Sequence, residues 1–334
     1  MIDSGGLFAA LRERVLLSIP AGSQPALNTS NGIADWLKNG TYLVTSCTKA
    51  GVTLQISHVD FASALLAETE NFLNHCLEHV EELVCGHGDT RQRSDAWATV
   101  TAYYLGFFAT SVLLRLVGSP VVFLTREQLK SLQAIAGSVT VPSQGAFRFT
   151  VGAPVSAIYT ELRIIPTQKI HEATWKQAFV LIDGLRNDPA LLMQADEADF
   201  YSSLCTQSFF SYGIGYDWPS SVRNQANYRA GYVYRLLRPE YTIRSFLESW
   251  RLGNKKDVYQ ILREVYARCN AGRDIFAHSA EMMTNVSIVF YLLARALYRE
   301  LVDRRLTDRR WEQQRNVYRR SMSIAPDEFE PLKM

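Results

Sequence analysis

The segment Arg273-Asp-Ile-Phe-Ala-His278 combines a permanently charged guanidinium with an imidazole that titrates near neutral pH. Such a pair suits phosphate chemistry, because arginine pairs with phosphoryl oxygens and histidine transfers protons. A five-residue step on a continuous helix turns the chain by about 500°, which would leave the two side chains about 140° apart. They converge only where the chain bends. Asn270-Ala-Gly272 is a typical helix stop and Ser279 is a typical helix cap, so the sequence predicts a bend here.

This segment resembles the Rx4-6H motif of the HEPN superfamily, because a polar residue, Asp274, follows the arginine and a long apolar helical pattern comes next. A second stretch is similar to the second helix of HEPN proteins and ends in Leu113-Leu114-x3-Gly118. Its characteristic aromatic residues are Trp97, Tyr103, Tyr104, Phe107 and Phe108. The resemblance covers residues 60–118 and 242–304. It implies a mostly α-helical up-and-down bundle with metal-independent endoribonuclease activity, which in this superfamily commonly serves toxins or antiphage defence.

The implied reaction needs few protein groups, because RNA carries its own nucleophile, the 2′-hydroxyl. The enzyme must supply a proton acceptor, a proton donor and positive charge for the pentacovalent phosphate. Under the resemblance, His278 transfers protons, Arg273 balances the phosphate charge, and Asp274 orients one of them. No metal ion or cofactor is required. Since one chain supplies one such pair, we expect a homodimer that apposes two of them.

An alternative of a different class stays open. It is a helical module that binds RNA, a nucleotide or a partner protein without cleaving anything, because HEPN-like domains also occur without catalytic activity. Growth arrest on induced expression that requires both Arg273 and His278 would favour the nuclease. The resemblance to toxins also implies an antitoxin or another regulatory protein as a partner.

Two further segments carry side chains suited to RNA. The polar segment 212–235 contains residues that we expect to line the same groove as the Arg/His pair: Arg223, Asn227, Tyr228 and Arg229. The stretch 304–320 contains seven arginines against two acidic residues, with aromatic residues between them. Because guanidinium groups pair with phosphates and stack on bases, we expect Arg309 and Arg310 to contact RNA. Docking of this stretch on the acidic helix at residues 60–84 is the alternative.

A histidine cluster lies at the end of the acidic helix. His75 and His79 are four residues apart, so both imidazoles face one way and could share a metal ion with Cys85 or His87. The spacing matches no established zinc-site pattern. We therefore interpret these residues as surface histidines and predict no metal, while zinc in the purified protein would indicate a metal-dependent enzyme.

Composition and missing motifs argue against an NTPase, a zincin protease and an α/β-hydrolase. With 334 residues, 47% of them hydrophobic and 20% charged, the chain is typical of a packed globular protein. The net charge of +2 means that any surface for nucleic acid must be local. The sequence has no GxxxxGK[ST], HExxH or GxSxG motif, and Gly213-Ile-Gly215 lacks the third glycine of a dinucleotide loop.

The sequence favours a cytoplasmic location. Five scattered cysteines without a CxxC motif favour a reducing compartment, and the first residues lack the pattern of a secretory signal. Residues 96–114 carry no charge and are about long enough to cross a bilayer. Because this stretch contains several Thr, Tyr and Ser residues, we interpret it as a buried helix and expect no membrane contact.

Hydrophobic periodicity defines the elements that must position these residues. It predicts helices at residues 7–17, 60–84, 95–117, 174–185, 190–210, 242–251, 256–269 and 280–304. Short β-prone runs occur at residues 41–47, 52–56, 121–125, 138–141 and 147–151. The predicted fold class is a mostly α, up-and-down helical bundle with a small β-containing insertion. We divide the chain into an N-terminal appendage (1–57), a HEPN-like helical domain (58–304) with an insertion at about 119–240, and a basic C-terminal tail (305–334).

Overall fold

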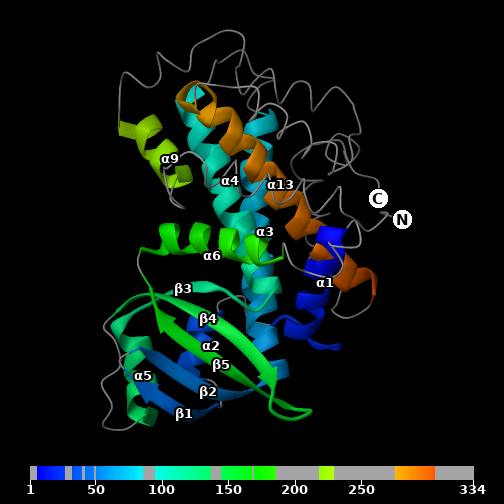
Figure 1. Cartoon of the computed structure of the whole chain (residues 1–334), viewed down its shortest axis with the longest axis vertical. Helices are drawn as coiled ribbons and strands as arrows, with labels where there is room; N and C mark the ends of the chain where they lie inside the picture. The colour runs from blue at the N-terminus through cyan, green and yellow to red at the C-terminus, as the bar shows by residue number, and fades with distance from the viewer. Residues whose placement is uncertain are drawn as a thin grey trace.

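The computed structural model is a mixed α/β fold, in which an antiparallel five-stranded sheet lies at one end of a layer of long helices (Figure 1). The prediction of a mostly α-helical bundle with a small β insertion is therefore wrong. Strands that are far apart in the sequence pair with one another, and local periodicity does not show such pairing. The structure describes residues 6–26, 32–39, 42–48, 50–85, 95–136, 144–167, 169–185, 218–228 and 275–304.

The sheet has the strand order β1-β2-β5-β4-β3, and all neighbouring strands are antiparallel. The strands are β1 (Tyr42–Thr48), β2 (Gly51–Ser57), β3 (Val121–Leu124), β4 (Gly145–Pro154) and β5 (Tyr159–Pro166). Four of the β-prone runs correspond to strands, the run at 138–141 lies outside the described residues, and β5 was not predicted. The β2–β5 pairing, with Leu54 opposite Leu162, joins strands of the predicted appendage and of the predicted insertion in one sheet.

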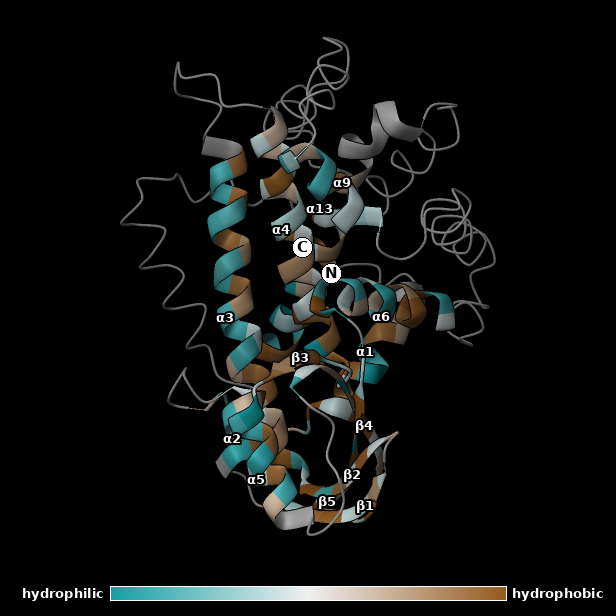
Figure 2. Cartoon of the chain, turned by 90° about the vertical axis from the view of Figure 1, so that its left-hand side faces the viewer, coloured by the Kyte–Doolittle hydropathy of each residue, from teal (hydrophilic) through white to brown (hydrophobic). Residues whose placement is uncertain are grey.

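The long helices predicted at residues 60–84 and 95–117 are present and form a hairpin. They are α3 (His58–Cys85) and α4 (Asp95–Leu116), which pack against each other along their length. Hydrophilic residues mark the outer side of α3 in Figure 2, whereas α4 is apolar on all sides. This helix is long and apolar enough to cross a membrane, but most of it is buried inside the protein, which confirms its prediction as a buried helix.

The last long helix, α13 (Ile275–Asp303), covers α4 from the other side and begins five residues before its predicted start. The two helices approach closely at Gly106. A Cβ atom there would lie 2.9 Å from the Cβ of Ser287 and 3.0 Å from the ring of Trp175. Only glycine fits this crossing, because real Cβ contacts are longer.

A shorter helix, α6 (Ile170–Gly184), completes the core around α4. It confirms the helix predicted at 174–185 and lies between the sheet and the helical layer (Figure 1). Its Trp175 is fully buried against Tyr103 of α4 and Phe290 of α13. The remaining helices are α1 (Gly6–Ser18), α2 (Ile33–Asn39), α5 (Arg126–Ala136) and α9 (Trp218–Tyr228).

Helix α9 lies within the polar segment 212–235, where the sequence analysis predicted no helix. Its Trp218, Val222 and Ala226 are buried. They recur every four residues, so one narrow apolar stripe packs against α4 while the rest of the helix stays polar. The helices predicted at 190–210, 242–251 and 256–269 lie outside the described residues.

Candidate functional site

The predicted catalytic segment lies at the beginning of α13. His278 is the fourth residue of this helix, and Arg273 precedes the helix by two positions. The structure describes the backbone of His278 but not its side chain, and Arg273 and Asp274 lie outside the described residues. The helix therefore starts within the motif, between the arginine and the histidine, rather than after both as the sequence predicted.

Arg223 of α9 lies on a platform of aromatic rings supplied by α4. Its Cζ atom is 5.0 Å from the ring centroid of Tyr103 and 5.9 Å from that of Tyr104. Its Nη1 donates a hydrogen bond of 3.4 Å to the hydroxyl of Tyr104. Within the described part of the chain, Nε of Arg223 is buried without a hydrogen-bond partner, and no carboxylate pairs with the guanidinium. Among the described residues, the positive charge of Arg223 is thus held by ring faces rather than by a carboxylate.

Of the other residues predicted to bind RNA, the structure describes two. Asn227 and Tyr228 lie on α9 with Arg223, and both are exposed; the Tyr228 side chain is 80% exposed. An exposed aromatic ring next to an arginine is suited to stack on a base. The remaining members of the prediction lie outside the described residues: Arg229, Arg309 and Arg310.

Two residues that sequence reasoning missed, His171 of α6 and Ser220 of α9, both bond to Tyr103 of α4. The hydroxyl of Tyr103 lies 2.8 Å from Nδ1 of His171 and 3.1 Å from Oγ of Ser220. Tyr103 is fully buried, and the ring centroid of His171 lies 4.3 Å from that of Phe107. A single histidine with no patterned neighbours gave no signal in the sequence, because its partners are 68 and 64 positions away.

The environment keeps this cluster uncharged apart from Arg223. Burial lowers the pKa of His171, and the positive charge of Arg223 lowers it further. Burial also raises the pKa of the Tyr103 hydroxyl. His171 is therefore neutral at pH 7, with one ring nitrogen able to donate and the other able to accept a hydrogen bond.

The histidines of α3 extend the same aromatic surface. His75 and His79 both stack on Phe108, with centroid distances of 4.9 and 5.4 Å. Nδ1 of His75 lies 3.0 Å from Oε2 of Glu78, and Nδ1 of His79 lies 4.0 Å from a carboxylate oxygen one turn further on. His87 and the side chain of Cys85 lie outside the described residues. Among the residues that the structure describes, no group of three or more His, Cys, Asp or Glu is placed to hold a metal ion.

We expect the protein to lose stability on acidification through His171 and His79. Burial lowers the pKa of both imidazoles below the ordinary value of 6.5. The unfolded chain then binds more protons than the folded chain below about pH 6.5, so the free energy of unfolding falls as the pH decreases from 7.5 to 5.5. Urea denaturation of His171→Asn should show a smaller decrease between these pH values than the wild type. An equal decrease would show that His171 does not titrate in this way.

Comparison with known proteins gives no match to any family model, curated protein or solved structure. The chemistry of this site is therefore indicated by its own residues alone.

Proposed function

We propose that this protein cleaves RNA without a metal ion and that Arg223 binds a phosphate of the RNA. The proposal is carried by the environment of Arg223. Its guanidinium lies on two tyrosine rings and has no carboxylate partner in the described part of the chain. A half-buried charge without an opposite charge is costly, and a phosphate oxygen is the ligand that a guanidinium pairs with best.

The place of Arg223 in the fold supports a link to the Arg273/His278 motif. Helix α9 contacts α13, and Figure 1 shows it beside the end at which α13 begins. In the proposed reaction, His278 of one subunit accepts the proton of the attacking 2′-hydroxyl, and His278 of the partner subunit donates a proton to the leaving 5′-oxygen. Arg273 and Arg223 balance the charge of the phosphate, and Asp274 orients the motif. The products are a 2′,3′-cyclic phosphate and a 5′-hydroxyl.

The proposal includes a homodimer, because a second histidine is needed as the partner acid or base. Light scattering on the full-length chain at micromolar concentration measures the oligomeric state directly. A monomer whose activity stays linear in enzyme concentration down to the nanomolar range would refute the dimer. The proposal also includes a regulatory protein, such as an antitoxin, as a partner.

The test is incubation of the purified full-length protein with RNA in excess EDTA. We expect cleavage of RNA, no cleavage of DNA or 2′-O-methyl RNA, and products that carry 2′,3′-cyclic phosphate. Products with 5′-phosphate, or cleavage that depends on added Mg²⁺, would overturn the proposal. A non-catalytic RNA-binding module is the second candidate, because the exposed ring of Tyr228 and the half-buried guanidinium of Arg223 suit binding without cleavage. Binding of RNA without any cleavage would select this second candidate.

We expect Arg223→Gln to weaken the binding of 2′-O-methyl RNA by about 10- to 100-fold, the effect of losing a hydrogen bond to a charged group. The slope of log affinity against log salt concentration should become shallower by about 1, because one fewer counterion is released. Arg163→Gln is the matched control, since Arg163 is an exposed arginine of β5 that already pairs with Glu161. Equal salt slopes for both variants would assign Arg223 to packing on Tyr103 and Tyr104.

A further inference from the structure

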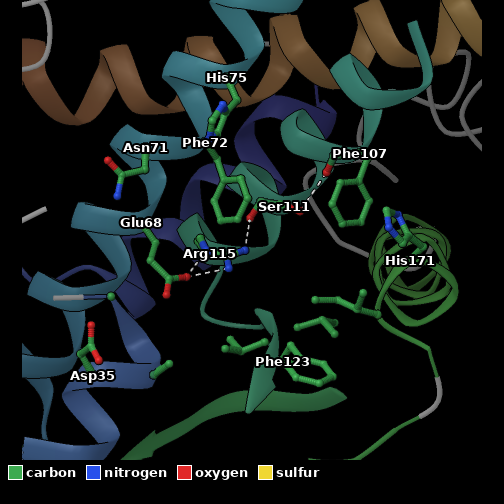
Figure 3. Close-up of a pocket in the computed structure, with 15 residues that line it drawn as sticks. Asp35, Glu68, Asn71, Phe72, His75, Phe107, Ser111, Arg115, Phe123 and His171 are labelled. Carbon is green, nitrogen blue, oxygen red and sulfur yellow. Dashed lines mark hydrogen bonds and ion pairs between the residues drawn. The ribbon is translucent and has the colours of Figure 1, made fainter. Parts of the chain in front are cut away.

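A cavity of about 480 Å³ lies between the helical hairpin and the sheet (Figure 3). Phe72 of α3 and Phe107 of α4 point from above toward β3, where Phe123 lies on the opposite side. Phe107 is buried, whereas Phe123 is 50% exposed at the edge of the cavity. The size is within the range of small-molecule sites, roughly 300–1,000 Å³, and aromatic rings are typical of their linings.

The positive charge at the wall of this cavity is already neutralised. Nε and Nη2 of Arg115 both lie 2.6 Å from Oε2 of Glu68, and Nη1 donates to the carbonyl of Ser111 at 3.0 Å. The Cζ atom of Arg115 lies 4.2 Å from the ring centroid of Phe72. Oε1 of Glu68 accepts a hydrogen bond from the backbone N–H of Ile33. Arg115, the one arginine among the described lining residues, is therefore not free to pair with a phosphate or a carboxylate ligand.

The remaining polar groups of the lining are an acceptor and several groups that both donate and accept. Asp35 of α2 contributes a carboxylate that makes no hydrogen bond or ion pair within the described part of the chain. Asn71, His75 and His171 contribute an amide and two imidazoles. A ligand with an amino group pairs with the carboxylate of Asp35, and its ring nitrogens add hydrogen bonds to those that Asn71, His75 and His171 already make within the protein. A planar ring packs against the phenylalanine side chains.

We propose that this cavity binds an amino-bearing nucleobase, with its ring packed on Phe72, Phe107 and Phe123 and its exocyclic amino group donating to Asp35. His171 lines the cavity and also bonds to Tyr103, on whose ring Arg223 lies. The cavity is thus adjacent to the phosphate site proposed above. If a base of the RNA occupies the cavity, this inference rests on the proposed function. If a free nucleoside occupies it, the inference does not depend on RNA cleavage.

Calorimetric titration of the full-length protein with each of the four ribonucleosides tests the proposal. We expect adenosine, guanosine or cytidine to bind more tightly than uridine, which lacks the amino group. Asp35→Asn should reduce this preference by about 10-fold, since it removes the charged acceptor but keeps the shape. Phe123→Ala should weaken all binding by about 10-fold. Tyr159→Ala, which removes a comparably exposed ring of β5, is the matched control and should change nothing.

A second arm distinguishes the source of the base. If the base belongs to RNA, uncleavable RNA with abasic positions should bind more weakly than intact RNA, and Phe123→Ala should abolish the difference. If free nucleosides bind while abasic and intact RNA bind alike, the occupant is a free base or nucleoside. Nucleoside binding in a protein that does not cleave RNA would support the cavity proposal and refute the nuclease. Absence of nucleoside binding at concentrations on the order of 10 mM, together with no effect of abasic positions, would overturn the cavity proposal.

Discussion

In excess EDTA, the His278→Ala protein is expected to cleave RNA at least about 100-fold more slowly than the wild type, the lower end of the effect of losing a general acid or base. Arg273→Ala should lose a similar factor, because an arginine at the developing phosphate charge contributes on the order of 3 kcal/mol to transition-state stabilisation. Both variants should keep the melting temperature of the wild type. The measurement is the initial rate on a defined RNA, followed by the amount of cyclic phosphate.

Two control substitutions separate chemistry from structure. Arg299→Ala removes an arginine from the opposite end of α13, where it pairs with Asp303, and should leave the rate unchanged. His58→Ala removes a histidine that bonds to the carbonyl of Ser18 at the sheet end of α3. It should affect stability but not cleavage by the folded protein. Wild-type rates for His278→Ala would refute the assignment, as would an equal loss in both control variants.

Removal of either partner of the Glu68–Arg115 ion pair is expected to lower the free energy of unfolding by about 3–5 kcal/mol. The side chain of Arg115 is only 4% exposed, and that of Glu68 is 15% exposed. Arg115→Ala leaves a carboxylate with little access to water, and Glu68→Ala also removes the acceptor for the N–H of Ile33 at the start of α2. Leaving one charge buried is costlier than losing both, so Glu68→Gln combined with Arg115→Met should be more stable than Arg115→Ala alone.

Urea denaturation of these variants measures the effect. The control is Arg163→Ala, which breaks the exposed pair with Glu161 and should cost less than about 1 kcal/mol. If Arg115→Ala cost no more than Arg163→Ala, the buried pair would not stabilise the fold. Because Arg115 also packs on Phe72, nucleoside binding by any folded variant reports whether the cavity keeps its shape.

Elements whose signal is contained in a short stretch of residues were predictable from the sequence alone. The hairpin of α3 and α4 follows from apolar residues at three- and four-residue steps and from one long uncharged stretch, which a short window of sequence contains in full. The strands β1 to β4 were also within reach, as β-prone runs bounded by turn residues. Strand β5 has the alternating pattern of a half-buried strand, because Thr160, Leu162 and Ile164 are buried and the positions between them are exposed or half-exposed. Sequence reasoning missed it because the strand contains several polar residues.

How these elements join depends on contacts between distant segments, which the sequence analysis did not predict. Strand β2 pairs with β5 more than 100 positions away, and this pairing turned two separate β regions into one sheet. The candidate site depends on the same kind of contact. Sequence reasoning selected Arg223 for its charge, but its aromatic platform comes from α4, 119 positions away, and His171 was not selected at all. Residue types and periodicity specify which chemistry a chain carries and which segments are helices or strands. Which groups meet depends on how apolar faces from distant segments are buried together. The free energy of that burial is gained only when the whole chain packs, so no short window of sequence contains it.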